Sequence, residues 1–110
     1  MGDPGRQDPP DVLIGLSDFA RRVLDVVDGI PPGSVMTYGD IAECLGVPAP
    51  RAVGAVMARY GGEVPWHRVV YGDGRLPPRH EAEARRRLRS EGVGLRGDRV
   101  DLAAARWPGR

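Results

Sequence analysis

The fold is decided by the stretch TYGDIAECLGVPAPRAVGAVMARY, residues 37–60, which has the pattern of two short amphipathic helices separated by a turn. Thr37 and Asp40 have the spacing of a capping box, with aspartate in place of the usual glutamate, so the first helix is predicted to begin at Tyr38. Gly46 is predicted to end this helix, because glycine readily adopts the left-handed conformation that follows a helix.

The second helix of this stretch is predicted to run from Pro50 to about Tyr60, since proline suits a first helical turn. One of its faces carries apolar residues at helical spacing: Val53, Val56, Met57 and Tyr60. The opposite face carries one cation and a strip of small residues: Arg51, Gly54, Ala55 and Ala58. A helix, a glycine turn and a helix of this length are typical of a helix-turn-helix, here at about residues 37–60.

The flanking segments predict one domain, residues 15–110, preceded by a disordered tail, residues 1–14, which is polar and rich in turn residues. Ser17 is the predicted N-cap of a helix that ends at Asp28, with one apolar face: Phe19, Val23, Val26 and Val27. A short strand is expected at residues 69–71. The C-terminal stretch has weak pattern and is expected to pack by its apolar residues: Leu95, Val100, Leu102 and Trp107.

A last helix is predicted over about residues 80–91. Two acids in its first turn have arginines four residues beyond them, as Glu81 with Arg85 and Glu83 with Arg87. Glu91 falls on the same face as Ala84 and Leu88, which turns its carboxylate toward the protein and requires a polar partner there.

The charge of the chain is unevenly distributed. Residues 1–50 contain three arginines and eight acids, whereas residues 51–110 contain thirteen arginines and seven acids, and no lysine is present. Arginine suits bidentate phosphate contacts and stacking on bases. A GC-rich genome explains the absence of lysine equally well, but it does not explain the asymmetry. The run at residues 85–89 is interpreted as a solvated helix face.

The composition also limits the function classes. No apolar run approaches the length that crosses a bilayer, so we expect a location in the bacterial cytoplasm or nucleoid and no membrane partner. A single cysteine, Cys44, and two histidines provide neither a disulfide nor a zinc centre. We therefore expect no metal and no cofactor.

Four segments, in order and at matching approximate spacing, resemble the C-terminal DNA-binding domain of the alkylguanine-DNA alkyltransferases over roughly residues 17–95. They are MTYGDIAECLG (36–46), PRAVGAVMA (50–58), VPWHRVV (64–70) and RLRSEGV (87–93). The resemblance implies a mostly α, single small domain with a helix-turn-helix, winged-helix-like core and little β structure. The family signature is Pro-Cys-His-Arg, whose cysteine takes the alkyl group from the 6-oxygen of guanine.

Tryptophan stands in the place of this cysteine, in Pro65-Trp66-His67-Arg68. An indole is not a nucleophile toward an alkyl group, so transfer at this position is excluded and no catalytic residue is expected. The same exchange marks the alkyltransferase-like proteins. The resemblance implies that the chain binds double-stranded DNA containing 6-O-alkylguanine, flips the base and marks it for nucleotide excision repair proteins. We expect it to act as a monomer.

The resemblance also implies the DNA-binding residues. Tyr38 crowds the phosphate of the target nucleotide, and Arg51 fills the gap left by the flipped base. The small residues of the second helix let it lie in the minor groove. The predicted DNA-binding set is Thr37, Tyr38, Arg51, Gly54, Ala55 and Ala58.

The lesion pocket implied by the resemblance is walled by Trp66, with Tyr38, His67 and Val70 as its other members. His67 and Glu91 match the residues that activate the cysteine, and here they are predicted to form a buried structural pair. Arg68 is predicted to be an ion-pair partner. The loop at residues 75–80 is shorter than that of the family, and the asparagine usual before the signature is replaced, so pocket size and alkyl-group range stay open.

Two other functions are weighed against this hypothesis. A sequence-specific helix-turn-helix regulator presents polar residues to base edges, and the small face of the second helix offers none. An alkyltransferase with another nucleophile has Cys44, the serines, Tyr38 or His67 available, but no pair has the spacing of a known triad. Cys44 lies on the first helix, far in sequence from the signature, and is interpreted as a small packing residue.

Overall fold

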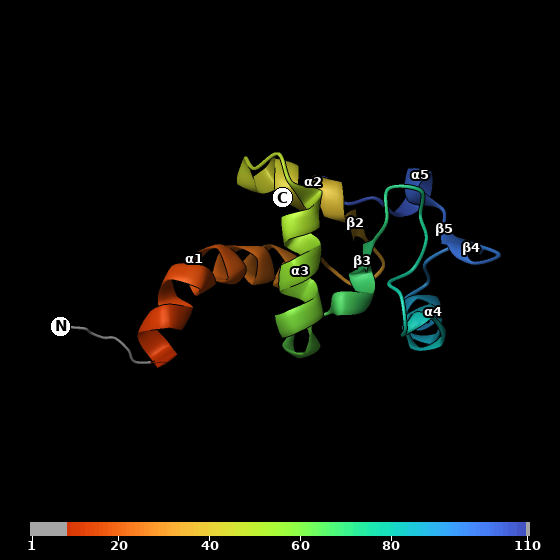
Figure 1. The fold of residues 1–110 in the computed structure, drawn as a ribbon. Helices are drawn as coiled ribbons and strands as arrows, with labels where there is room; N and C mark the ends of the chain where they lie inside the picture. The colour runs from red at the N-terminus through yellow and green to blue at the C-terminus, as the bar shows by residue number, and fades with distance from the viewer. Residues whose placement is uncertain (1–8, 110) are drawn as a thin grey trace.

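Helices dominate the computed structural model, which describes residues 9–109 of the chain (Figure 1). The elements are α1 (Pro9–Asp28), β2 (Met36–Thr37), α2 (Tyr38–Leu45), α3 (Pro50–Tyr60), η1 (Gly61–Glu63), η2 (Trp66–Arg68), β3 (Val69–Val70), α4 (Glu81–Ser90), β4 (Leu95–Arg96), β5 (Arg99–Val100) and α5 (Leu102–Ala105). The mostly α fold with little β structure is therefore confirmed.

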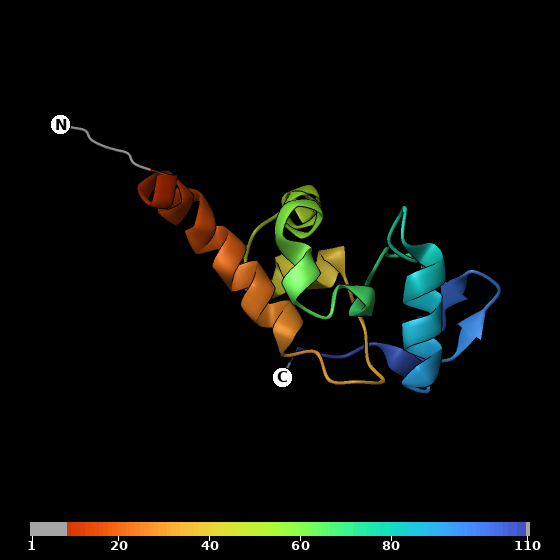
Figure 2. The same cartoon turned by 90° about the horizontal axis from the view of Figure 1, so that it is seen from below.

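The first half of the molecule is a three-helix core in which α1 packs against α2 and α3, with α1 running away from the rest of the molecule toward the N-terminus (Figure 2). Val23 and Val27 of α1, Ile41 of α2 and Val53 of α3 are fully buried in one cluster. Each such side chain contributes about 1.5–3 kcal/mol to folding through removal of apolar surface from water.

The start and end of α2 are set by local contacts, as predicted. The Oγ1 of Thr37 accepts a hydrogen bond from the Asp40 amide at 2.9 Å, and the Asp40 carboxylate accepts one from the Thr37 amide at 3.1 Å. Gly46 follows the helix with a φ of 73°, a conformation that favours glycine. These contacts confirm the capping box.

Helices α2 and α3 form the predicted helix-turn-helix, and the axis bends by 108° between α2 and residues 50–63. An angle in this range is typical of the motif. No single helix in the described part of the chain is long and apolar enough to cross a membrane. Only this bent pair, taken together, has the required length and composition.

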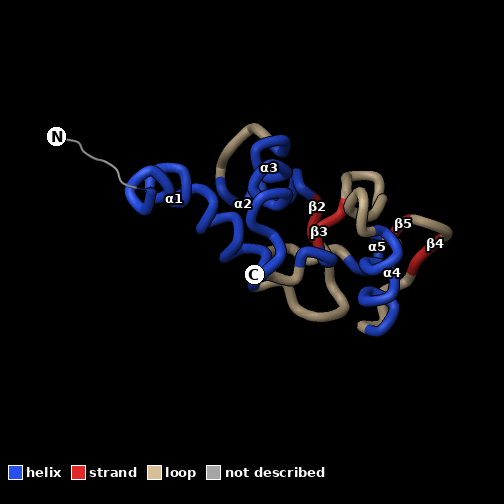
Figure 3. The backbone as a smooth tube through the Cα atoms, turned by 60° about the horizontal axis from the view of Figure 1, so that its bottom comes forward, coloured by secondary structure: helices blue, strands red, loops and turns tan. Residues whose placement is uncertain are grey.

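A parallel pairing of β2 with β3 joins the helix-turn-helix to the second half of the molecule (Figure 3). Met36 pairs with Val69 and Thr37 pairs with Val70. The strand is shorter by one residue than the predicted 69–71. The pairing brings the residue after each strand, Tyr38 and Tyr71, to the same end of the ladder.

The second half of the molecule packs around a separate buried cluster: Val35, Val70, Leu76, Ala84, Leu88, Val93, Val100 and Ala105. Helix α4 occupies the predicted position. The antiparallel β4–β5 hairpin and α5 were not predicted, because two-residue strands and a four-residue helix carry too little periodicity to be recognised. Backbone hydrogen bonds at Val35, to Ala105 at 2.9 Å and from Trp107 at 2.8 Å, attach this C-terminal part to the centre.

Helix α1 begins at Pro9, so the predicted N-cap at Ser17 is wrong, and the predicted domain boundary at residue 15 falls inside this helix. Residues 9–14, assigned to the mobile tail, are helical, while residues 1–8 lie outside the described part. The physical reason is that proline suits a helix start and the sequence continues the apolar spacing upstream of Phe19.

Candidate nucleic-acid interface

One face of α3 carries small residues, with Arg51 as its one long side chain. Arg51, Ala55 and Ala58 are exposed and Gly54 is half-buried. No hydrogen bond or ion pair joins Arg51 to another described residue. A Cβ on Gly54 would lie 4.0 Å from the ring of Tyr38, so this tyrosine stands directly beside the small-residue face. The structure therefore brings five predicted DNA-binding residues onto one surface, while Thr37 is buried and serves as the cap of α2.

Tyr38 opens α2 and is half-buried against Tyr71, whose ring centroid lies 5.2 Å from its own. Burial and the neighbouring Tyr71 raise the pKa of Tyr38 to about 12. Like an ordinary tyrosine, Tyr38 is protonated near neutral pH, so its hydroxyl can donate a hydrogen bond to a phosphate oxygen.

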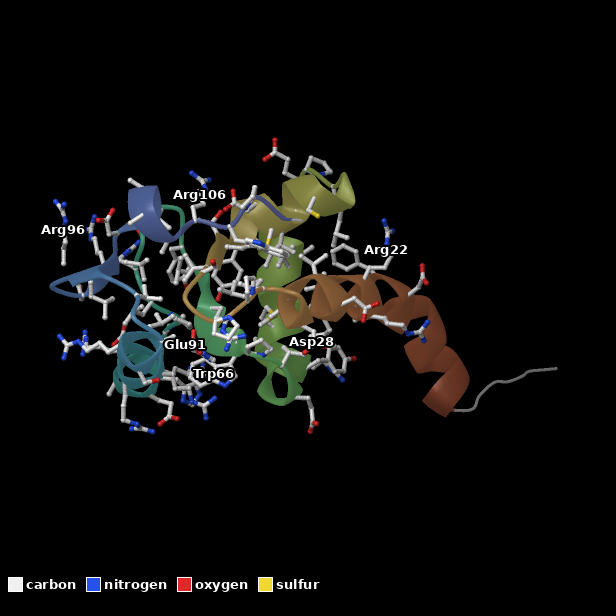
Figure 4. The ribbon with its side chains drawn as sticks, turned by 180° about the vertical axis from the view of Figure 1, so that it is seen from behind. Arg22, Asp28, Trp66, Glu91, Arg96 and Arg106 are labelled. Carbon is white, nitrogen blue, oxygen red and sulfur yellow. The ribbon has the colours of Figure 1, made fainter. Side chains whose placement is uncertain are left out.

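The signature residues form the short helix η2, and Trp66 fills the space between η2 and α4 (Figure 4). The Trp66 ring is half-buried, with the Cζ atom of Arg87 at 5.3 Å from its centroid and the ring of His80 at 5.6 Å. His80 and Arg87 are both exposed. An aromatic surface is thus present at this position, covered by two exposed side chains, of which Arg87 is also ion-paired with Glu83 at 2.7 Å.

Glu91 is the C-cap residue of α4, and its carboxylate is the shared partner of several polar groups near Trp66. It lies 2.7 Å from His67 Nε2 and accepts hydrogen bonds from Arg68 Nη2 at 2.8 Å and from the Gly33 amide at 3.2 Å. Arg68 also donates to the Ile30 carbonyl at 2.9 Å. The predicted partner of Glu91 and the predicted ion-pair role of Arg68 are both present.

The ionisation states of this cluster follow from its geometry. Burial opposes the charge on Glu91, but hydrogen bonds from Arg68, His67 and Gly33 outweigh it and lower the pKa to about 2. Burial lowers the pKa of His67 below its ordinary value, although Glu91 opposes this effect. A neutral His67 that donates from Nε2 leaves Nδ1 as an acceptor, and Nδ1 is buried without a partner among the described residues.

The predicted lesion pocket is only partly open. Val70 is fully buried and His67 is 4% exposed, so Tyr38 and Trp66 are the two members that offer surface. One hollow of about 510 Å³ is lined by Tyr71, Arg75, Leu76, Pro78, Glu81, Arg85 and Asp98. Another of about 470 Å³ is lined by Met36, Asp40, Glu43, Cys44, Arg106, Trp107 and Pro108. Neither hollow is lined by Trp66.

Comparison with known proteins places this geometry in a family. Residues 18–93 match the family described as 6-O-methylguanine DNA methyltransferase, DNA binding domain. The chain belongs to this family, as an alkyltransferase-like member.

Relatives of similar length are found in bacteria and yeast. The DNA base-flipping protein of Escherichia coli is 42% identical over 95 residues, which cover 81% of this chain and 74% of that protein. Alkyltransferase-like protein 1 of Schizosaccharomyces pombe is 40% identical over 85 residues, which cover 71% and 79%. Methylated-DNA–protein-cysteine methyltransferases are also among the relatives.

A solved structure extends the match to the fold. The crystal structure of S. pombe Atl1 in complex with damaged DNA containing O6-carboxymethylguanine has a TM-score of 0.72 at 35% identity. The match covers 83% of this chain and 95% of that one.

The sequence analysis did not predict that Tyr71 and Arg75 continue the exposed surface beside Tyr38. Tyr71 is 37% exposed, which makes it the exposed large hydrophobic side chain of the described part, and the Cζ of Arg75 lies 5.5 Å from its ring centroid. An aromatic residue at the end of a strand, directly before Gly72, was the available signal.

The charged residues of α4 follow the prediction in part. Glu83 forms ion pairs with Arg87, at 2.7 Å, and with Arg86. The predicted pair of Glu81 with Arg85 does not form among the described residues, and both side chains line the 510 Å³ hollow. Arg86, Arg87 and Arg89 are exposed, as predicted for a solvated helix face, whereas Arg85 is half-buried and lines this hollow.

Cys44 is exposed on α2 and lines the 470 Å³ hollow with Trp107 and Arg106, so its interpretation as a small packing residue is wrong. None of the signature residues, 65–68, lines this hollow. Among the side chains that the structure describes, no group of three His, Cys, Asp or Glu is placed to hold a metal ion.

Proposed function

We propose that this chain recognises alkylated guanine in double-stranded DNA and flips the damaged base without transferring its alkyl group. The observation that carries the proposal is Trp66, which stands in the signature at the position where the transferases have their nucleophilic cysteine. Two relatives support it by name, a DNA base-flipping protein and an alkyltransferase-like protein whose crystal structure contains damaged DNA.

In this proposal α3 lies in the minor groove with its small-residue face against the DNA. Arg51 enters the duplex from the first turn of the helix and occupies the gap that the flipped base leaves. Flipping costs a few kcal/mol of stacking and pairing, and it costs least for a damaged base, which favours alkylated over normal guanine.

Tyr38 acts beside α3 on the phosphate of the target nucleotide. Its protonated hydroxyl donates to the phosphate oxygen, while its half-buried ring, packed on Tyr71, supplies the rigid surface that makes the nucleotide rotate. The parallel β2–β3 pairing holds this ring in place.

The flipped base stacks on Trp66 after His80 and Arg87 move aside. Both covering side chains are exposed, so moving them does not disrupt the core. His67 and Val70 support the site from beneath, and the His67–Glu91 pair keeps η2 in position although no thiol is left for it to activate. We propose that nucleotide excision repair proteins process the marked site and that the chain binds as a monomer, as one DNA-binding domain.

The test is a titration of the chain into matched duplexes with and without one methylated guanine, at stated salt, followed by mass spectrometry of both partners. We expect tighter binding to the methylated duplex with both masses unchanged. Methyl transfer to the protein, or equal binding of both duplexes, contradicts the proposal. A strong preference among undamaged sequences indicates a regulator instead.

Replacement of Arg51 by alanine tests the mechanism in the same assay. We expect at least a tenfold loss of affinity for the methylated duplex and loss of most of the preference for it, because the flipped state is no longer filled. Arg89→Ala is the matched control, since Arg89 is an exposed arginine on α4. An equal effect of both variants reduces Arg51 to a general electrostatic role.

A further inference from the structure

The parallel pairing of β2 and β3 places two tyrosines side by side. Thr37 pairs with Val70, and the next residue of each strand is a tyrosine, Tyr38 and Tyr71. Their rings lie 5.2 Å apart at an angle of 45°. The ring of Tyr71 therefore continues the surface that begins at the small face of α3 and passes over Tyr38.

Arg75 extends this surface by one more step. Its Cζ atom lies 5.5 Å from the centroid of the Tyr71 ring, which gives a cation–π contact. The carboxylate of Asp73 lies 2.8 Å from Arg75 Nε and also accepts a hydrogen bond from the Arg75 amide at 3.1 Å. The guanidinium is thus in contact with both the Tyr71 ring and the Asp73 carboxylate.

The outer edge of this guanidinium is unoccupied. The Arg75 side chain is 59% exposed, and its Nη1 and Nη2 atoms make no hydrogen bond to another residue of the described chain. Two adjacent N–H groups of a fixed guanidinium match the spacing of two phosphate oxygens. Arg85 lines the same hollow, but Glu81 and Asp98 also line it and offset its charge. The cationic edge of the hollow is therefore the one beside Tyr71, where Arg75 lies.

The loop that carries Tyr71 and Arg75 projects on the same side of the molecule as α3 (Figure 2). Tyr71 lies between Tyr38 and Arg75, with its ring centroid 5.2 Å from that of Tyr38 and 5.5 Å from the Cζ of Arg75.

We propose that Tyr71 and Arg75 extend the DNA interface beyond Tyr38, with Arg75 binding a backbone phosphate and the Tyr71 ring holding the guanidinium in position. The inference rests on the proposed function for the placement of DNA. Arg75 is a positioning residue, because a phosphate contact fixes the register of the protein on the duplex and carries no information about the base.

The experiment measures the dissociation constant of the full chain for methylated and undamaged duplexes over a series of salt concentrations. For Arg75→Gln we expect about tenfold weaker binding of both duplexes, an unchanged ratio between them, and a salt slope smaller by about one. Arg75→Lys retains the slope because it keeps the charge. Arg96→Gln is the charge-matched control, since Arg96 is 85% exposed on the β4–β5 hairpin (Figure 4).

A salt slope of Arg75→Gln equal to that of the wild type, or equal to that of Arg96→Gln, overturns the inference. A loss of slope in Arg75→Lys as large as in Arg75→Gln does the same. If the wild type shows no preference for the methylated duplex, the proposed function fails, yet the slopes on undamaged DNA still decide whether Arg75 contacts a phosphate. Thermal unfolding of each variant verifies that the fold is intact.

Discussion

At the scale of single residues, the carboxylate of Glu91 connects three parts of the chain that are distant in sequence. It accepts hydrogen bonds from Gly33, from Arg68 and from His67, and through Arg68 it also reaches the Ile30 carbonyl. In a transferase such a pair of His67 and Glu91 would serve a thiol. In this chain the Glu91 carboxylate joins the C-terminal end of α4 to His67 and Arg68 of η2, which is consistent with the predicted structural pair.

Replacement of Glu91 by glutamine tests this role. Because it leaves Arg68 and His67 without their anionic partner, we expect a loss of about 2 kcal/mol in the free energy of unfolding, measured in urea. An unchanged urea midpoint contradicts the assignment. Ala82→Gln is the control, because it changes an exposed position of α4 and leaves the cluster intact. Gly92→Ala is not used, since Gly92 has a φ of 84°, at which alanine is strained.

The Glu91→Gln variant also isolates the contribution of Glu91 to the pH dependence of the free energy of unfolding. The pKa of Glu91 is about 2 in the folded chain against an ordinary 4.5, so the unfolded state binds more protons in this interval. The stability that Glu91 contributes is complete above pH 4.5 and is lost as the pH falls toward 2. His67, whose pKa is lowered, adds a loss in the same direction. We expect the free energy of unfolding of the wild type to decrease more steeply than that of Glu91→Gln over this interval, and parallel curves would show that Glu91 is not responsible.

At the scale of elements, the position of α3 determines what the surface can approach. Its apolar side is buried by Val53 and Val56 against α1 and α2, so the small-residue side must face outward. The cap at Thr37 and the turn at Gly46 fix α2, and α2 in turn places Tyr38 beside Gly54. The stability of the motif and the exposed small-residue surface therefore come from opposite sides of the same helix.

Enlarging one small residue of α3 should block close approach without harming the fold. For Ala55→Leu we expect at least tenfold weaker binding of damaged and undamaged duplexes, because the added side chain prevents the helix from entering the groove. The melting temperature should stay within about two degrees, since Ala55 is exposed and leucine is a good helix former. The control is Ala82→Leu on the exposed side of α4, and equal weakening by both variants would remove the argument for α3.

At the scale of the whole molecule, two buried clusters meet along the β2–β3 pairing. Trp107 packs against the first cluster and Trp66 against the second. The contacts of Arg68 with Ile30 and of Glu91 with Gly33 cross the same boundary. The chain also closes on itself where Arg106 forms a bidentate pair with Asp40, at 2.9 and 2.7 Å.

These links predict that both clusters unfold together. In Trp66→Phe and Trp107→Phe, each of which retains one tryptophan, the fluorescence of the remaining indole should report on one cluster. For each variant we expect the midpoint from fluorescence to coincide with the midpoint from far-ultraviolet circular dichroism. A Trp66 signal that is lost at lower denaturant than the helical signal would instead show that the second cluster is an independent unit.

The sequence by itself determined those features that depend on residues near one another in the chain. Thr37 and Asp40 lie three residues apart, so their capping box and the start of α2 could be predicted, as could the turn at Gly46 and the position of Trp66 in the signature. The predicted start of α1 was wrong, because Ser17 has the residue type of an N-cap although it lies inside a helix that begins at Pro9. The hairpin and α5 were missed because such short elements are stabilised by their neighbours and not by their own periodicity.

Only the tertiary structure decided which distant residues meet. The register of β2 on β3 is set by the burial of Met36, Val69 and Val70 in the core, and no local rule contains it. That register placed Tyr71 beside Tyr38 and Arg75 beside Tyr71, and it buried Val70 away from the predicted pocket. Non-local packing selects one arrangement among many that satisfy the same local preferences, and for this reason the placement of Tyr71 and Arg75 beside Tyr38 could not be predicted from the sequence.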